Sequence, residues 1–415
     1  MARVHIIGAG LAGLSAGVEL ARKGYETIIY EQANQAGGRA RSFNDAHLDR
    51  LIDNGNHLML SGNYSITNML ETINASARLI GPEKACFDFA DLETGDEWTI
   101  NFNRGPVPLW VLYESTRVPG TSMMDYIAGL KLLTAGNRTV KNLFGEQGQM
   151  YRRFWEPFSV AVLNTAPDIA VARLMLPVLR ETLAKGSEFS KPLVAKKGLS
   201  HTFIDPALKW LSYRKADVRF GQRVSKIQVS NNRVTAIVAG KKTETLGPDD
   251  KVVLAAPPWV TPTLVEGIIA PDEFAPIVNV HFQVEGFDET KTKTPMLGLV
   301  GSVSQWLFVR GDIISVTVSA GHGLAEKSSK EIAAITWPEV AKAYDLDPTK
   351  IPPARVIKEQ RATFIATPDQ LAKRAPTKTH LHNLVLAGDW TDTGLPATIE
   401  GAIRSGVSAA KAILK

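Results

Sequence analysis

The chain has 415 residues, 44% of them hydrophobic and 21% charged, so it is long enough for two or three domains with cores of their own. The net charge is +5, but the basic residues are scattered rather than gathered in a stripe, which argues against nucleic-acid binding. Cys86 is the only cysteine, which excludes an intrachain disulfide and a four-cysteine zinc site. The sequence contains no run of 18 apolar residues, so no transmembrane helix is predicted.

The N-terminal stretch predicts a strand, a glycine-rich turn, a helix and a second strand. The first strand covers residues 4–7, the helix continues over 14–22, and the second strand covers 26–30 and ends at Glu31. This order of elements, with an acidic residue about 20 positions beyond the glycines, is typical of dinucleotide-binding units.

Each glycine of the turn has a task in such a unit. Gly8 permits the tight turn, Gly10 lets backbone approach a pyrophosphate, and Gly13 lets helix and strand pack closely. The helix N-terminus offers free N–H groups to the anion, and Glu31 accepts hydrogen bonds from the adenosine ribose. The residues predicted to bind the nucleotide here are Gly8, Gly10, Leu11, Ala12, Gly13, Glu31 and Gln32.

A second glycine pair follows within EQANQAGGRARS, residues 31–42. Gly37 and Gly38 allow another close backbone approach, and Arg39, next to Ala40, supplies a fork for a second phosphate oxygen. The combination resembles the flavoprotein amine oxidase and phytoene desaturase superfamily, in which this loop contacts FAD. The resemblance implies FAD as the cofactor, held non-covalently because no cysteine lies in the flavin-facing C-terminal region, unless a histidine makes the link.

The middle of the chain contains two segments that the superfamily returns to the nucleotide domain. Residues 217–239 look like strands with a turn at Asn231 and Asn232, and residues 251–258 look like a buried strand. The resemblance implies that Val224 meets the adenine through its backbone and that Ala255 lies at the cofactor.

The C-terminal region predicts a buried strand at 384–387 and a helix from about Ile399. By resemblance, the Gly-Asp pair after the strand meets the FAD pyrophosphate and ribityl chain, and the helix N-terminus points at the flavin pyrimidine ring, where its positive end stabilises the anionic reduced ring. A helix that only closes the core is the alternative. The residues assigned here are Gly388, Asp389, Pro396, Thr398, Ile399 and Gly401.

These elements predict an α/β fold with a Rossmann-like FAD-binding domain that is discontinuous in sequence. Its parallel sheet draws on residues 1–60, 195–258 and 380–415. Residues 61–194 and 259–379 form the substrate domain, with a mixed sheet and a helical cap over about 105–194.

Longer blocks go beyond the superfamily, chiefly DNGNHLML, LNT and GDWTDTGLPATIEGA. They closely resemble hydroxysqualene dehydroxylases, the bacterial squalene-associated FAD enzymes, nearly from end to end. Residue 56 is Asn where Gln is expected, Gly17 stands where Ala is usual, and residues 105–148 follow the family only loosely. The resemblance implies reductive removal of the allylic hydroxyl of hydroxysqualene to give squalene and water, in squalene and hopanoid biosynthesis, with the hydride coming from N5 of reduced flavin.

Three residues are candidates for catalysis. Asn54 and Gly55 should approach the isoalloxazine, so His57 is expected near the ring, where a near-neutral pKa would let it protonate the leaving hydroxyl or relay a proton through water. A structural histidine bonded to backbone is the alternative. Trp306 is either a flavin-facing aromatic or core packing, and Arg361 faces either the flavin or a salt bridge.

The expected partners are a lipid substrate, an electron donor for the flavin and a peripheral membrane contact, with a cytoplasmic location on the inner face of the cell membrane. Residues 120–150 carry a Met/Leu/Ile face beside Lys131, Arg138 and Lys141, which either dips into a membrane or packs on its own core. Two other functions share this pattern. One is a polyene desaturase that uses oxidised FAD, and the other is a lipid-binding escort protein of the kind represented by Rab GDP-dissociation inhibitors.

Overall fold

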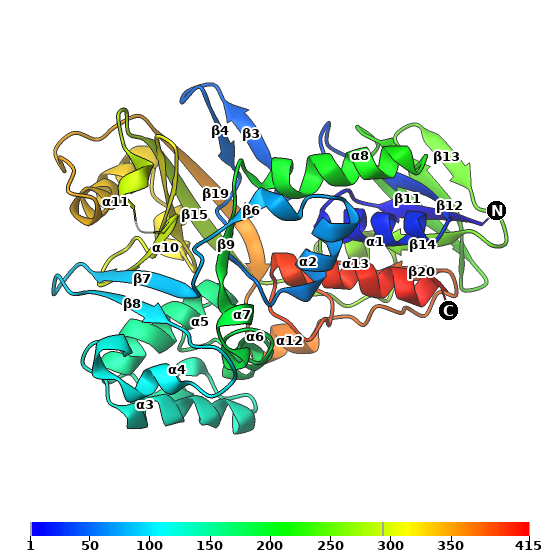
Figure 1. Cartoon of the computed structure of the whole chain (residues 1–415). Coiled ribbons are helices and arrows are strands. Elements are labelled where there is room, and N and C mark those ends of the chain that lie inside the picture. Colours follow the sequence, from blue (N-terminus) through cyan, green and yellow to red (C-terminus); the bar gives the residue numbers. More distant parts are fainter. Residues whose placement is uncertain (1, 293, 415) are drawn as a thin grey trace.

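The structure is a computed structural model that describes residues 2–292 and 294–414. At one end of the molecule lies a five-stranded parallel sheet with the strand order β10-β2-β1-β14-β20 (Figure 1). Its strands are β1 (Arg3–Ile7), β2 (Glu26–Tyr30), β10 (Asp217–Arg219), β14 (Lys251–Leu254) and β20 (Leu384–Leu386). The sheet therefore assembles from three separate parts of the sequence, which confirms the predicted α/β class and the discontinuous nucleotide sheet.

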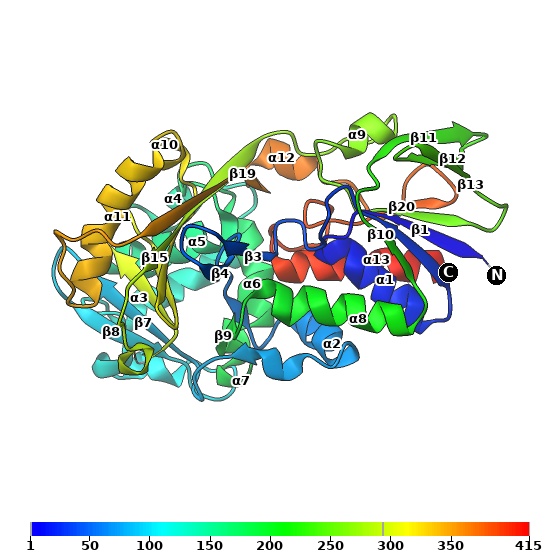
Figure 2. The same ribbon diagram turned by 90° about the horizontal axis from the view of Figure 1, so that it is seen from above.

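Both faces of this sheet are covered, as the continuous apolar strands require. One face carries α1 (Leu11–Arg22), α2 (Tyr64–Thr72), α8 (Asp205–Tyr213) and α13 (Ile399–Leu414) (Figure 2). The other face carries an antiparallel sheet of β11 (Val224–Ser230), β12 (Arg233–Ala239) and β13 (Lys242–Thr245). The predicted turn joins β11 to β12, and Asn231 and Asn232 both have φ near the left-handed region, at 50° and 55°.

The second large sheet has seven strands in the order β19-β15-β18-β17-β16-β7-β8, and only β16 and β7 run parallel. It is the predicted mixed sheet. Its strands are β7 (Cys86–Asp91), β8 (Glu97–Asn101), β15 (Phe274–Gln283), β16 (Met296–Val300), β17 (Trp306–Arg310), β18 (Ile313–Val318) and β19 (Ala354–Phe364). Helices α10 (His322–Ala325) and α11 (Ser329–Ala343) pack on one face through a shared apolar core.

The cap, which we define as residues 105–190, follows β8 and lies beside β7 and β8 at the lower edge of Figure 1. It consists of short helices with an apolar core of its own. They are η2 (Leu109–Leu112), η3 (Glu114–Thr116), α3 (Met123–Ile127), η4 (Ala128–Thr134), α4 (Val140–Phe144), η5 (Tyr151–Trp155), α5 (Glu156–Leu163), η6 (Ala172–Leu174), α6 (Met175–Glu181), η7 (Leu183–Lys185) and α7 (Ser187–Ser190).

Short elements join these bodies, and β3 pairs with β4 as a hairpin. They are β3 (Ser42–Asp45), β4 (Arg50–Asp53), β5 (Met59–Leu60), η1 (Ser76–Arg78), β6 (Leu79–Ile80), β9 (Pro192–Ala195), η8 (Ser200–Ile204), α9 (Thr261–Leu264), η9 (Glu289–Lys291) and α12 (Pro368–Ala372). Helix α2 packs into the core beneath α1 and α13, although its residues fall in the range 61–194 predicted for the substrate domain. We propose the predicted domain division with α2 on the nucleotide side.

No helix in the described ranges is both long and apolar enough to cross a membrane.

Candidate active site

The first glycine loop is packed as a nucleotide cradle requires. Gly8 has φ +105°, and a Cβ on it would lie 2.6 Å from the carbonyl oxygen of Ala255. A Cβ on Gly13 would lie 1.9 Å from the carbonyl oxygen of Gly8, so turn and helix touch there. A Cβ on Gly10 would meet no described atom within 4 Å. Open space therefore lies directly over Gly10, at the start of α1.

That open space adjoins free backbone donors. Gly10 is the N-cap of α1, and no described side chain caps this helix. The first turn, which contains Leu11 and Ala12, therefore presents unpaired N–H groups and a partial positive charge to the space. Such a helix N-terminus is suited to bind an anion such as a pyrophosphate.

Glu31 lies at the end of β2, beside this loop. Its carboxylate accepts hydrogen bonds from the N–H groups of Ala9 and Ala33, both at 2.9 Å, and the side chain is buried. Each carboxylate oxygen keeps a second lone pair for a ribose hydroxyl. The N–H of Gln222 donates to the Glu31 carbonyl at 2.8 Å, which brings the start of β11 at Val224 to the same edge of the sheet. Gln32 is exposed.

The second glycine loop lies against the first. The N–H of Gly37 donates to the carbonyl of Ala9 at 2.8 Å, and Gly37 forms an isolated β-bridge with Gly10. Gly37 and Gly38 have φ of +110° and +56°, which only glycine adopts without strain, and Ala40 closes the turn onto the Gly37 carbonyl. The two predicted loops therefore form one continuous cradle.

Arg39 joins this cradle to the C-terminal segment. Its guanidinium donates to Asp389 at 2.6 Å and to the carbonyl of Ala362. Burial opposes the charge, but the neighbouring Asp389 carboxylate raises the pKa of Arg39. The Arg39 guanidinium, which was predicted to bind a phosphate, thus binds the Asp389 carboxylate and the Ala362 carbonyl. The ion pair fixes Asp389 against the glycine loop.

The loop that contains Asp389 is held from beneath by Arg374, which the sequence analysis did not identify. The Arg374 guanidinium donates to the carbonyl oxygens of Asp389 and Trp390, both at 3.3 Å, and to that of Thr391. Burial lowers the pKa of Arg374 to about 10. A buried cation that binds a row of carbonyls stiffens this loop, which begins at Gly388 with φ +151°.

Helix α13 begins where the sequence predicts. The Thr398 hydroxyl accepts from the N–H of Gly401 at 3.0 Å, two residues after Pro396, and Ile399 is buried in the core. Glu400 accepts from the N–H groups of Ser65 and Ile66, both at 3.0 Å, so α13 also fixes the start of α2.

The segment from Asn54 to His57 lies between the cradle and the seven-stranded sheet. The amide of Asn54 donates to the carbonyl of Arg39 at 3.3 Å, and a Cβ on Gly55 would lie 3.2 Å from Nδ2 of Asn279. The His57 ring has no hydrogen-bond partner among the described residues and is half-buried. The segment therefore lies between the second glycine loop and Asn279, and its contact with the flavin stays a prediction.

Burial lowers the pKa of His57 to about 4, with a further contribution from Arg39 and an opposing one from Asp53. The expectation of a near-neutral pKa is therefore wrong. At pH 7 the imidazole is neutral, which leaves a relay rather than direct protonation by the imidazolium.

A row of side chains crosses the sheet beside this segment. Asn279 pairs with Thr317, Thr317 pairs with Trp306, and the register continues through Gly298 to Phe89. Cross-strand partners share a face, so the row begins with an amide and a hydroxyl and continues with aromatic rings. A Cβ on Gly298 would lie 2.5 Å from the Phe89 ring, so the glycine makes room for the rings.

The polar end of the row is bonded to the segment from Asn54 to His57. Asn56 donates through its backbone and its side chain to Oδ1 of Asn279, both at 3.4 Å, and through Nδ2 to the Thr317 hydroxyl at 3.0 Å. Sequence analysis missed Asn279 and Thr317. The signal was available, since VNVHF and ISVTV place polar residues at every second position of two otherwise apolar strands.

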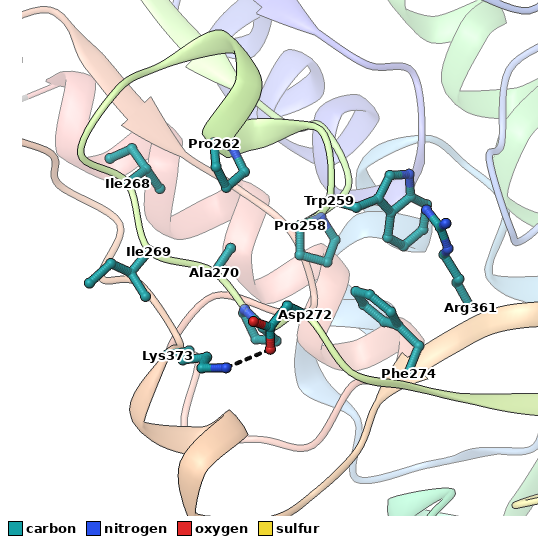
Figure 3. A pocket seen from close by; sticks show the side chains of 11 residues that line it. Pro258, Trp259, Pro262, Ile268, Ile269, Ala270, Asp272, Phe274, Arg361 and Lys373 are labelled. Atoms are coloured by element: carbon teal, nitrogen blue, oxygen red, sulfur yellow. Dashed lines mark hydrogen bonds and ion pairs between the residues drawn. The ribbon is translucent and has the colours of Figure 1, made fainter.

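The remaining two catalytic candidates lie in different surroundings. Trp306 is buried in an aromatic cluster and meets the Phe89 ring edge-on at 5.5 Å between centroids. Arg361 stacks over Trp259 at 4.9 Å in a 550 Å³ cavity, while Lys373 pairs with Asp272 on another wall (Figure 3). Arg361 is thus brought together with Trp259 and not with His57, while its neighbour Ala362 accepts from Arg39.

The parallel nucleotide sheet, the paired glycine loops and the seven-stranded mixed sheet define a flavin-containing oxidoreductase, with FAD as its cofactor. Residues 11–414 match the family of flavin containing amine oxidoreductases. The chain is 42% identical to the hydroxysqualene dehydroxylase of Sinorhizobium fredii over 408 residues, 98% of this chain and 97% of that protein. It belongs to this family, as the sequence blocks predicted.

Two further comparisons agree. The chain is 41% identical to the hydroxysqualene dehydroxylase of Rhodopseudomonas palustris over 413 residues, which cover 99% of this chain and 98% of that one. The fold is similar to that of cyclohexylamine oxidase from Brevibacterium oxydans, with a TM-score of 0.70 at 15% identity, covering 99% and 98% of the two chains.

Proposed function

We propose that this chain reductively removes the allylic hydroxyl of hydroxysqualene, giving squalene and water in squalene and hopanoid biosynthesis. The observation that carries the proposal is the row from Asn279 and Thr317 to Trp306 and Phe89. It offers polar groups at one end, beside His57, and aromatic faces along the rest. A long hydrocarbon with one hydroxyl group has matching parts, because its hydroxyl suits the polar end of the row and its carbon chain suits the aromatic part. The name of the relatives at 41–42% identity supports the same substrate.

The reaction breaks one C–O bond and forms one C–H bond, and it consumes one proton to release water. When bound, FAD in its reduced form supplies the hydride. The chain's own residues bind and orient the alcohol, because the amide of Asn279 and the Thr317 hydroxyl lie where a substrate hydroxyl can join their hydrogen bonds.

His57 takes part as a neutral ring. With a pKa of about 4 it is uncharged at pH 7, so it accepts a proton from water on one nitrogen and passes one from the other to the departing oxygen. Trp306 and Phe89 hold the allylic chain, and their ring faces stabilise positive charge on its carbons. The apolar surroundings of the hydrocarbon also exclude bulk water from its carbons, where water would otherwise recapture the cation.

The test supplies the FAD-loaded protein with hydroxysqualene and a flavin reductant without oxygen, and measures squalene by mass spectrometry. Squalene is expected with reduced FAD, and in deuterated water it should carry one deuterium, because the hydrogen on N5 of reduced flavin exchanges with the solvent. Formation of a polyene with oxidised FAD, and no squalene with reduced FAD, would instead support desaturation. A purified protein that binds no FAD would support the escort function.

We further propose that a separate electron donor reduces the flavin, and that the chain works in contact with the inner face of the cell membrane. The insolubility of the proposed substrate in water supports the membrane contact.

A further inference from the structure

Nine large apolar side chains of the cap are strongly exposed, at 47–70% of their surface. We call them the cap patch: Val107, Leu109, Leu112, Tyr113, Met123, Met124, Ile127, Leu130 and Leu133. They fall within 27 consecutive residues, whereas the other exposed large apolar side chains are spread over the rest of the described chain. Single exposed apolar residues are ordinary, but such a concentration marks an interaction site.

The helical stretch formed by α3 and η4 is apolar on both sides. Its inner side packs on the protein, because Leu132 is buried and a Cβ on Gly129 would lie 3.3 Å from the Trp155 ring. Its outer side carries Met124, Ile127 and Leu130. Large apolar side chains gathered on the outer side of a helix are expected to be covered by a partner, and this outer side has no cover within the described chain.

The charges around the cap patch are mainly positive. Residues 104–138 contain four basic and two acidic residues, and the exposed Lys131 and Arg104 have no ion pair among the described residues. Unpaired cations beside an apolar surface match an anionic lipid headgroup layer above acyl chains. A second copy of this chain would bring the same positive charges together, which disfavours self-association through this face.

The inner sides of η2 and α3 pack against the same apolar cluster as Trp306 of the proposed active site. Trp110 of η2 and Tyr126 of α3 belong to one apolar cluster with Trp306, and Leu58, next to His57, packs against that cluster. In Figure 1, α3 lies at the lower edge of the molecule, below α4 and β8 and away from the nucleotide sheet. A continuous set of apolar side chains therefore connects the inner side of the cap with Trp306 and with Leu58 beside His57.

We infer that the cap patch docks this chain on an anionic lipid bilayer and that the substrate enters beneath the cap from that bilayer. The docking rests on the cap patch and its charges. The identity of the molecule that enters rests on the proposed function.

The experiment measures co-sedimentation of the FAD-loaded protein with phosphatidylcholine vesicles that contain or lack phosphatidylglycerol. We expect binding to the anionic vesicles, and weaker binding without phosphatidylglycerol or at high salt. The combined substitution Met124→Ser, Ile127→Ser and Leu130→Ser is expected to weaken binding at least about tenfold, since it removes the apolar area that inserts.

A matched control replaces three exposed apolar residues outside the cap, as Leu51→Ser, Tyr213→Ser and Val229→Ser, and is expected to bind like the wild type. Both triple variants should keep the FAD absorbance bands and the melting temperature, which separates lost docking from lost folding. Wild-type protein that stays in the supernatant with anionic vesicles would overturn the inference. Equal binding by the cap variant would also overturn it, as would a dimer in light scattering that this variant alone converts to monomer.

Turnover separates this inference from the proposed function. With hydroxysqualene presented in vesicles, the cap variant should form squalene more slowly than the wild type. Failure of the wild type to form squalene from any preparation would contradict the proposed function and leave the vesicle-binding result unaffected. Equal rates for both proteins with vesicle-borne substrate would overturn the access route.

Discussion

The Thr317 hydroxyl on β18 donates to Oδ1 of its cross-strand partner Asn279 on β15 at 2.8 Å. Both side chains are buried in a sheet whose other face is apolar, and both also bind Asn56, which precedes His57. Buried polar groups are stable when they have hydrogen-bond partners, and here those bonds join the sheet to the segment that contains Asn56 and His57. The pair thus helps to set the position of that segment.

Thr317→Val tests this pair, because valine keeps the shape and removes the hydroxyl. Turnover of hydroxysqualene is expected to fall about tenfold, the value of one lost hydrogen bond of about 1.4 kcal/mol, while FAD content is unchanged. Thr99→Val is the matched control, since Thr99 bonds to Asp88 elsewhere on the same sheet. Equal turnover in wild type and Thr317→Val would remove Thr317 from the proposed site.

The neutral state of His57 gives a prediction about pH. Because its pKa is about 4, the rate of squalene formation should not change through ionisation of His57 between about pH 5.5 and 8. His57→Phe should lower the rate about a hundredfold, and His57→Gln should recover part of it because an amide can still donate and accept. A rate that falls with an apparent pKa near 6.5, and does so only in the wild type, would instead identify the imidazolium as the acid.

The parts of the site that sequence could predict are those whose requirement is local. Gly8, Gly13 and Gly37 follow from backbone conformation and close approach, which depend on neighbours in the chain and on one strand–helix contact. The pairing of Asn279 with Thr317 depends on the register of two strands 38 residues apart, which no local pattern specifies.

Arg374 and the cap illustrate the same limit. Nothing in the sequence around Arg374 distinguishes it from a surface cation. Its role depends on the fold, which brings its guanidinium to the carbonyls of residues 389–391. The apolar cap residues allowed two alternatives, a membrane face or a helix packed on its own core. The exposure of Met124 and Leu130 favours a membrane face on the outer side. The burial of Leu132 shows that the inner side packs on the core of the cap.

Gly10→Ala tests the cradle without disturbing the fold. The backbone at Gly10 has φ −73°, which alanine adopts freely, and a Cβ there meets no described atom within 4 Å. The added methyl instead occupies the space assigned to the pyrophosphate, so FAD affinity should fall at least about tenfold at an unchanged melting temperature of the apoprotein. Gly323→Ala, also at an open glycine, should bind FAD normally. Wild-type affinity in Gly10→Ala would contradict the placement of the cofactor.

The last prediction concerns His281, which is buried on β15 two residues beyond Asn279 and bonds through Nδ1 to the Ser315 hydroxyl at 2.8 Å. Burial lowers the pKa of His281 to about 4, against about 6.5 in the unfolded chain. Between these values the unfolded chain binds the extra proton, so this contribution to stability is complete above pH 6.5 and is lost as the pH falls toward 4.

At pH 5 the loss from His281 amounts to about 2 kcal/mol relative to pH 7.5, measured as the free energy of unfolding in urea. His281→Gln has no titrating group at this position, so its stability should fall less steeply over the same range, even if it is lower at pH 7.5. Ser315→Ala keeps the buried imidazole and should retain the steep wild-type dependence. Parallel curves for wild type and His281→Gln would show that the ring is not held neutral by burial.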